Sequence, residues 1–109
     1  MRAARSALFL ALALIAFAGG CSPGLPVATP AQIETARQRW PDARGEQLSQ
    51  GRQLYVYRCS SCHNLYLPTS HDEDEWRAAL DEMAGRAHLT PAESEAILRY
   101  LVSARDSAR

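Results

Sequence analysis

Residues 59–63 read CSSCH, so two thiols and an imidazole fall within five positions. A thiol–disulfide redox pair would need a strand–helix–strand context, and the chain shows no strand pattern. A structural zinc ion needs four ligands, and the other histidines, His71 and His88, are widely and irregularly spaced. A plain disulfide between Cys59 and Cys62 would leave His63 unexplained.

A fourth interpretation accounts for every residue of this pattern, which is typical of covalent haem attachment. Cys59 and Cys62 would each form a thioether with one of the two vinyl groups on the porphyrin edge. The two-residue gap sets the sulfur atoms at a matching separation on a short helical turn. His63 follows directly and would bind the iron from the proximal side. We therefore predict one covalent haem c.

The first 20 residues have the features of a bacterial export signal. Arg2 and Arg5 precede an apolar run over 7–17, and small residues then lead to Cys21. This order is that of a secretory signal peptide, and the run is shorter than the about 20 residues that a membrane span needs. Small residues before a cysteine resemble a lipobox, which implies that Cys21 becomes the first residue and is acylated. Ordinary cleavage nearby is the alternative.

Cleavage before Cys21 leaves 89 residues, with 10 basic and 12 acidic side chains. All the basic side chains are Arg, and they are scattered along the chain, which argues against a nucleic-acid-binding surface. We expect an exported protein on the periplasmic side of a bacterial membrane, where acyl chains on Cys21 would provide a stable anchor.

The sequence divides into three parts. The signal peptide covers 1–20, and a lipid anchor, a tether and a short helix cover 21–43. A helical domain covers 44–105. The Pro- and Gly-rich stretch 22–31 is typical of a flexible tether, and Thr29 followed by Pro marks the start of the short helix.

Three further helices are expected in the domain. One runs over about 44–57 and contains Gly51, a residue that is unfavourable within a helix unless another backbone comes close. The next begins with a capping box formed by Ser70 and Glu73, and the last begins with Thr90 as its cap. A domain of this size buries only a modest core, so a large apolar cofactor would help to complete it.

These features resemble the small monohaem class I cytochromes c of the bacterial periplasmic or lipoprotein type. The resemblance covers roughly residues 40–102 and rests on GRQLYVYRCSSCHNLY (51–66), DEWRAALDEM (74–83) and LTPAESEAILRYL (89–101). It implies an all-α domain of three to four helices wrapped around a covalent haem. It also implies that Gly51 allows the first domain helix to cross close to the last one, where an aromatic side chain packs, with Tyr100 as the candidate.

The second axial ligand of the iron is less clearly marked. Met83 is the one methionine left after signal removal, and it lies on the apolar stripe of the third helix. The resemblance implies that its thioether binds iron together with His63, a ligand pair of electron-transferring cytochromes. His71, His88 or an open position are the alternatives. The resemblance further implies that the carbonyl of Pro68, or of a neighbour, accepts a hydrogen bond from the His63 ring.

The expected function is electron transport and not enzymatic catalysis, so no catalytic residue is predicted. The partners would be redox proteins: a membrane or periplasmic dehydrogenase, an oxidase or a reductase. The membrane itself would be contacted through the lipid anchor. The alternative is a haem-based enzyme or gas sensor with an open distal site, although the sequence shows no distal acid–base set.

Overall fold

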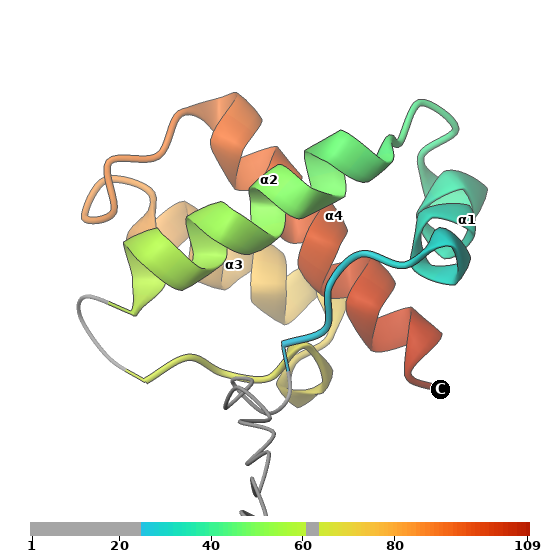
Figure 1. Cartoon of the computed structure of the whole chain (residues 1–109). Coiled ribbons are helices and arrows are strands. Elements are labelled where there is room, and N and C mark those ends of the chain that lie inside the picture. Colours follow the sequence, from blue (N-terminus) through green and yellow to red (C-terminus); the bar gives the residue numbers. More distant parts are fainter. Residues whose placement is uncertain (1–24, 61–63) are drawn as a thin grey trace, which may run out of the picture.

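The computed structural model describes residues 25–60 and 64–109, which form four α-helices and two short helical segments (Figure 1). The elements are, in order, α1 (Pro30–Arg39), α2 (Gly45–Leu54), the π-helix η1 (Tyr55–Cys59), the 3₁₀-helix η2 (Pro68–Ser70), α3 (Glu73–Met83) and α4 (Pro91–Ser107). These described residues contain no strand, so the predicted all-α class is confirmed. None of their helices is both long and apolar enough to cross a membrane.

The starts of α1 and α4 agree with the sequence analysis. The Thr29 side chain accepts a hydrogen bond from the backbone N–H of Gln32 at 3.2 Å. At α4, the Thr90 side chain and the Glu93 carboxylate cap each other's backbone N–H groups, which forms the expected capping box. Each cap satisfies N–H groups that have no partner within the helix.

The start of α3 differs from the prediction. The capping box is formed by Asp72 and Glu75, whose reciprocal hydrogen bonds both measure 2.8 Å. The predicted pair, Ser70 and Glu73, was wrong because Ser70 ends η2, where its hydroxyl donates to the carbonyl of Leu67 at 2.7 Å. The local 3₁₀ turn thus uses the hydroxyl, and α3 begins two residues later than the prediction.

Gly51 lies where α2 crosses α4. A Cβ atom built on Gly51 would lie 2.0 Å from the carbonyl oxygen of Ala96, which is far inside van der Waals contact. The predicted close approach between the two backbones is therefore confirmed. The nearest atoms belong to Ala96, whereas Tyr100 lies one turn further along α4 and is fully buried in the core.

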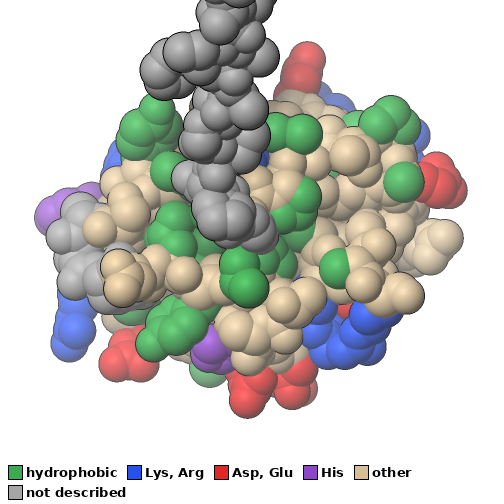
Figure 2. Space-filling model, turned by 60° about the horizontal axis from the view of Figure 1, so that its bottom comes forward, with side chains coloured by type: hydrophobic (Ala, Val, Ile, Leu, Met, Phe, Trp, Pro, Cys, Tyr) green, Lys and Arg blue, Asp and Glu red, His purple; other side chains and the backbone are tan. Residues whose placement is uncertain are grey.

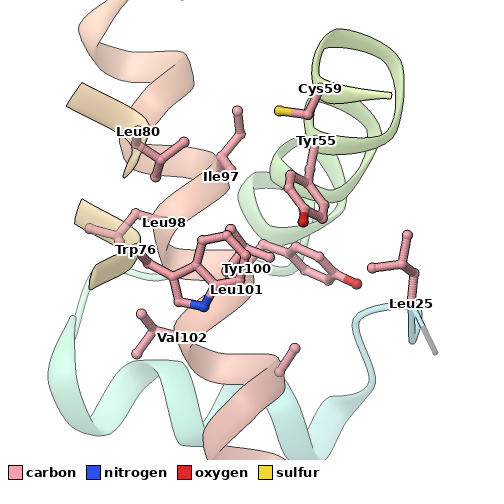
Figure 3. Close-up of a cluster of buried hydrophobic side chains, with 11 residues drawn as sticks. Leu25, Tyr55, Cys59, Trp76, Leu80, Ile97, Leu98, Tyr100, Leu101 and Val102 are labelled. Carbon is pink, nitrogen blue, oxygen red and sulfur yellow. The ribbon is translucent and has the colours of Figure 1, made fainter. Parts of the chain in front are cut away.

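The hydrophobic core is built around α4. Figure 1 shows α4 running through the middle of the molecule, and Figure 3 shows the core side chains gathered around it. The α4 residues of this cluster are Ile97, Leu98, Tyr100, Leu101, Val102 and Ala104, and the other buried members are Leu25, Tyr55, Cys59, Trp76 and Leu80. A single central helix therefore organises the side chains that surround the candidate site.

The segment before α2 packs more closely than a tether would. Leu25 is only 9% exposed and belongs to the core cluster. In α1, the buried Gln32 side chain donates to the carbonyl of Tyr100 at 3.3 Å and to Ser103 Oγ at 3.0 Å, both on α4. The packed unit thus includes residues from Leu25 onward, whereas the sequence predicts that a flexible stretch continues to residue 31.

Candidate functional site

Cys59 lies in the wall of a pocket of about 80 Å³ between η1 and α3. The lining residues are Tyr55, Cys59, Tyr66, His71, Trp76, Ala79, Leu80 and Met83. The pocket therefore brings the first cysteine of the CSSCH motif together with Met83 and His71, two of the side chains that the sequence offers as iron ligands. Most of the remaining lining is aromatic or aliphatic.

Cys59 is the last residue of the π-helix η1, which directly follows α2. The chain changes from α-helical to π-helical geometry over Tyr55–Cys59, a rare form that often occurs at functional sites. Both Tyr55 and Cys59 are buried in this wider turn, with Cys59 only 4% exposed. Figure 3 shows the Cys59 sulfur directed inward, toward the side of the core that carries Ile97 and Leu80.

Met83 is the last residue of α3, and its side chain lines the pocket. Trp76 and Leu80 precede it on the same helix face and are both buried, so the predicted apolar stripe does face inward. Met83 itself is partly buried. Its thioether is a soft donor, and such donors favour iron in electron-transfer sites.

His71 also lines the pocket, immediately before the cap of α3. Its Nδ1 lies 2.7 Å from the Ser70 hydroxyl oxygen. The ring lies 4.7 Å from the Trp76 ring and 5.3 Å from the Tyr66 ring, measured between centroids. These contacts fix the orientation of the imidazole at the pocket and leave Nε2 as the ring nitrogen that Ser70 does not engage.

His88 is placed differently from the other candidate ligands. Its side chain is exposed, its backbone has a positive φ of 53°, and it does not line the pocket. Its carbonyl accepts a hydrogen bond from Arg58 at 3.0 Å. The structure thus brings Met83 and His71 to the pocket, but not His88.

Tyr55 ties the segment after the motif to the pocket wall. Its hydroxyl donates to the carbonyl of Tyr66 at 2.6 Å, and its ring meets that of Trp76 edge to face at 5.9 Å. Burial raises the pKa of Tyr55 well above the ordinary value of 10.0. The hydroxyl thus stays protonated and remains a donor. Tyr66 also lines the pocket, and the sequence does not predict this, because its one signal is an aromatic residue shortly after the motif.

The carbonyl of Pro68 accepts a hydrogen bond from Trp76 Nε1 at 3.0 Å. The family resemblance implies that this acceptor, or a neighbouring one, bonds to the His63 ring. His63 and Cys62 lie outside the described residues, as does Cys21. Their roles as haem ligand, haem attachment site and acylation site remain predictions.

A larger cavity of about 280 Å³ lies between α3 and α4. Its polar lining consists of Arg77, Asp81, Ser94 and Glu95. It contains no sulfur or imidazole group, and Leu80 lines both this cavity and the smaller pocket. Of the two cavities, the smaller one is therefore lined by the side chains that the sequence predicts as haem-binding residues, Cys59 and Met83.

Within residues 25–60 and 64–109, no three His, Cys, Asp or Glu side chains converge as they would around a metal ion. Comparisons with protein-family models, with curated proteins and with solved structures find no match to this chain.

Proposed function

We propose that this chain is a c-type cytochrome that carries single electrons through one covalent haem on the periplasmic side of a bacterial membrane. The observation that carries the proposal is the shared pocket of Cys59 and Met83. These residues are 24 positions apart in the sequence, yet they line the same apolar pocket. A covalent attachment point and a soft iron ligand are the two groups that such a protein has to bring together.

The donor set and the lining both fit the proposed group. Cys59 lines the pocket, and Cys62 and His63 follow it in the sequence. Trp76, Leu80 and Tyr55 provide an apolar surface of the kind that encloses a flat macrocycle and excludes water. Haem in this environment would supply a one-electron iron couple, with a potential that its axial ligands and burial adjust.

The pocket has to enlarge to hold a haem, because cofactor sites usually measure about 300–1,000 Å³. The Tyr66 side chain lines the pocket and is 56% exposed, whereas Trp76 and Leu80 on the α3 side are buried in the core. An outward turn of the Tyr66 ring would therefore enlarge the pocket and leave the buried side chains in place.

Each side chain has a defined task in this proposal. Cys59 and Cys62 would each hold the porphyrin through a thioether, with the sulfur on one vinyl carbon and the thiol hydrogen on the other. His63 and Met83 would be the two iron ligands, and a ligand pair that stays bound in both oxidation states would suit electron transfer.

The decisive experiment is mass spectrometry and absorption spectroscopy of the protein produced in a host that matures cytochromes c. We expect a mass increment of one haem, an intense Soret band, and sharp bands that change on reduction. A variant with both Cys59→Ala and Cys62→Ala should lack the covalent increment. A colourless wild-type protein with the bare polypeptide mass would refute the proposal and favour a thiol–disulfide role.

Carbon monoxide separates the electron carrier from the haem enzyme or gas sensor. If Met83 stays bound, the reduced protein should show only a small and slow spectral change with this gas. A rapid and complete shift at neutral pH would instead indicate an open iron site, and the carrier assignment would have to be abandoned.

A further inference from the structure

The first described residues are fixed to the domain at one place. The Arg52 guanidinium, on α2, donates to the carbonyl of Leu25 at 3.1 and 3.3 Å. The Tyr100 hydroxyl, on α4, donates to the carbonyl of Pro26 at 2.7 Å. Together with the burial of the Leu25 side chain, these contacts determine the side of the molecule at which the chain reaches the folded unit.

This attachment limits how far Cys21 can lie from the domain. Only three residues separate Cys21 from Leu25. Since an extended chain spans at most about 3.6 Å per residue, the Cα atoms of Cys21 and Leu25 are no more than about 14 Å apart. A group carried by Cys21 therefore stays close to the side of the domain where Leu25 docks.

Exposed apolar side chains gather on the same side. Among the described residues, four large hydrophobic side chains are exposed, and three of them, Val27, Tyr66 and Leu67, belong to the two segments on this side. Figure 1 shows residues 64–67 along the lower side of the molecule and the segment from Leu25 beginning there before it rises to α1, and Figure 2, which turns this side forward, shows several hydrophobic groups on it. Tyr55 connects the two segments, because it bonds to the Tyr66 carbonyl and packs in the cluster of Leu25.

We infer that Val27, Tyr66 and Leu67 form a membrane-docking surface that rests on the lipid bilayer. The inference depends on the acylation of Cys21 that the sequence predicts and on the membrane location in the proposed function. Aliphatic side chains partition into the acyl boundary, and tyrosine rings favour the interface because they have an apolar body and a polar tip. The short link to Cys21 holds this surface at the membrane, so contact needs little additional affinity.

The charges near the surface determine which lipid it suits. Three acidic side chains, Asp72, Asp74 and Glu75, are exposed at the start of α3, whereas the nearby Arg39 and Arg77 are both paired with Glu73. Carboxylates do not attract anionic headgroups, so the contact is with uncharged or zwitterionic lipid. Because Tyr66 and His71 also line the candidate haem pocket, docking turns this edge of the pocket toward the bilayer. Electrons would then pass to or from a partner embedded in the membrane.

Hydrogen exchange measured by mass spectrometry tests the orientation. The full mature protein, acylated and loaded with haem, is reconstituted on phosphatidylcholine vesicles and compared with the Cys21→Ser protein in buffer. We expect amide exchange over residues 64–67 to slow several-fold on the vesicles, while the turn over residues 84–90 keeps its rate. Leu67→Asp, and separately Val27→Asp, should remove most of this slowing.

Tyr57→Asp is the matched control, because Tyr57 is 76% exposed but lies outside the proposed surface. It should leave the slowing unchanged. Equal exchange over 64–67 with and without vesicles, in a chain whose mass shows acylation, would overturn the docking surface and leave the proposed electron carrier intact. Slowing that appears only after phosphatidylglycerol is added would overturn the zwitterionic contact.

The mass of the intact protein distinguishes the remaining failures. A chain without acyl groups would overturn the anchor together with the docking inference. A chain with acyl groups but without haem would overturn the electron-carrier proposal, and the exchange data would still decide the orientation.

Discussion

Met83 and His71 line the same pocket as Cys59, and a pair of substitutions can show which of them is the iron ligand of the proposed haem. Because the position of Met83 at the end of the buried stripe favours it, Met83→Leu should remove the weak far-red band of sulfur-to-iron charge transfer in the oxidised protein. It should also make carbon monoxide binding fast. His71→Gln should preserve both properties. If His71→Gln has the larger effect and Met83→Leu has none, His71 is the ligand.

Because Tyr55 is buried, we expect the stability of the folded chain to decrease at high pH. Burial raises its folded-state pKa above the value of 10.0 that it has when unfolded, so above about pH 10 the unfolded chain releases a proton that the folded chain retains. The contribution of Tyr55 to the free energy of unfolding is therefore complete below about pH 10, and it decreases as the pH rises further. Denaturant titrations between pH 8 and 12 would measure this decrease.

The variant Tyr55→Phe should reduce the alkaline slope and cost about 1 kcal/mol at neutral pH through the lost hydrogen bond to Tyr66. Some slope should remain, because burial also raises the pKa of Tyr100. Tyr57→Phe, at an exposed position, should change neither quantity. An unchanged slope in Tyr55→Phe would contradict the assignment.

At the scale of elements, the crossing of α2 and α4 depends on Gly51. A methyl group at this position would overlap the Ala96 carbonyl oxygen at 2.0 Å. Because the overlapping atom belongs to the backbone, the overlap can be relieved only if the two helices move apart. Gly51→Ala should therefore lower the free energy of unfolding by about 3 kcal/mol, the upper part of the range for overpacked cores. Gly85→Ala is the control, because no atom lies within 4 Å of a Cβ there. Equal stability of the two variants would show that the helices do not cross as described.

The element boundaries show what local sequence signals can predict. Thr29 and Thr90 were recognised because a cap followed by proline is a signal contained within a few residues. The cap of α3 was misplaced because Ser70 and Asp72 both offer a suitable side chain, and the choice depends on the 3₁₀ turn before them. The π-helix over Tyr55–Cys59 could not be foreseen, since the same residues would also suit a continuous α-helix.

At the scale of the whole molecule, a chain of ion pairs connects the helices on the outside of the core. It runs in the order Asp106, Arg39, Glu73, Arg77, Glu95, Arg99 and Asp42. Arg77 joins its two halves, with nitrogen–oxygen distances of 3.2 Å to Glu73 and 4.0 Å to Glu95. These pairs therefore link α1, α3 and α4 with the loop before α2.

Replacement of Arg77 tests this network. Arg77→Gln should lower the free energy of unfolding by about 1 kcal/mol at low salt, near the upper value for exposed pairs. The difference from wild type should shrink in about 1 M sodium chloride, which screens charges beyond about 3 Å. Arg86→Gln, at an exposed position outside the network, should have little effect at either salt concentration. A loss that does not depend on salt would point to packing instead.

At the candidate site, only part of the lining can be predicted from the sequence, because its residues are far apart along the chain. Cys59 was identified from its own motif, and Met83 from its place on an apolar stripe. That both line one pocket depends on the packing of α2, η1 and α3 around α4, which no local pattern specifies. For the same reason the sequence could not exclude His88 or find Tyr66, since only the fold determines which side chains reach the pocket.

The docking of Leu25 and α1 also determines where the chain can be shortened for laboratory work. A fragment that begins at residue 44, as the sequence division suggests, would lose the Gln32 contacts to α4 and the side chain of Leu25 from the core. Newly bared apolar surface on α4 would favour aggregation during purification. Recombinant versions intended for crystallisation or spectroscopy should therefore begin upstream of Leu25, even where Cys21 is removed.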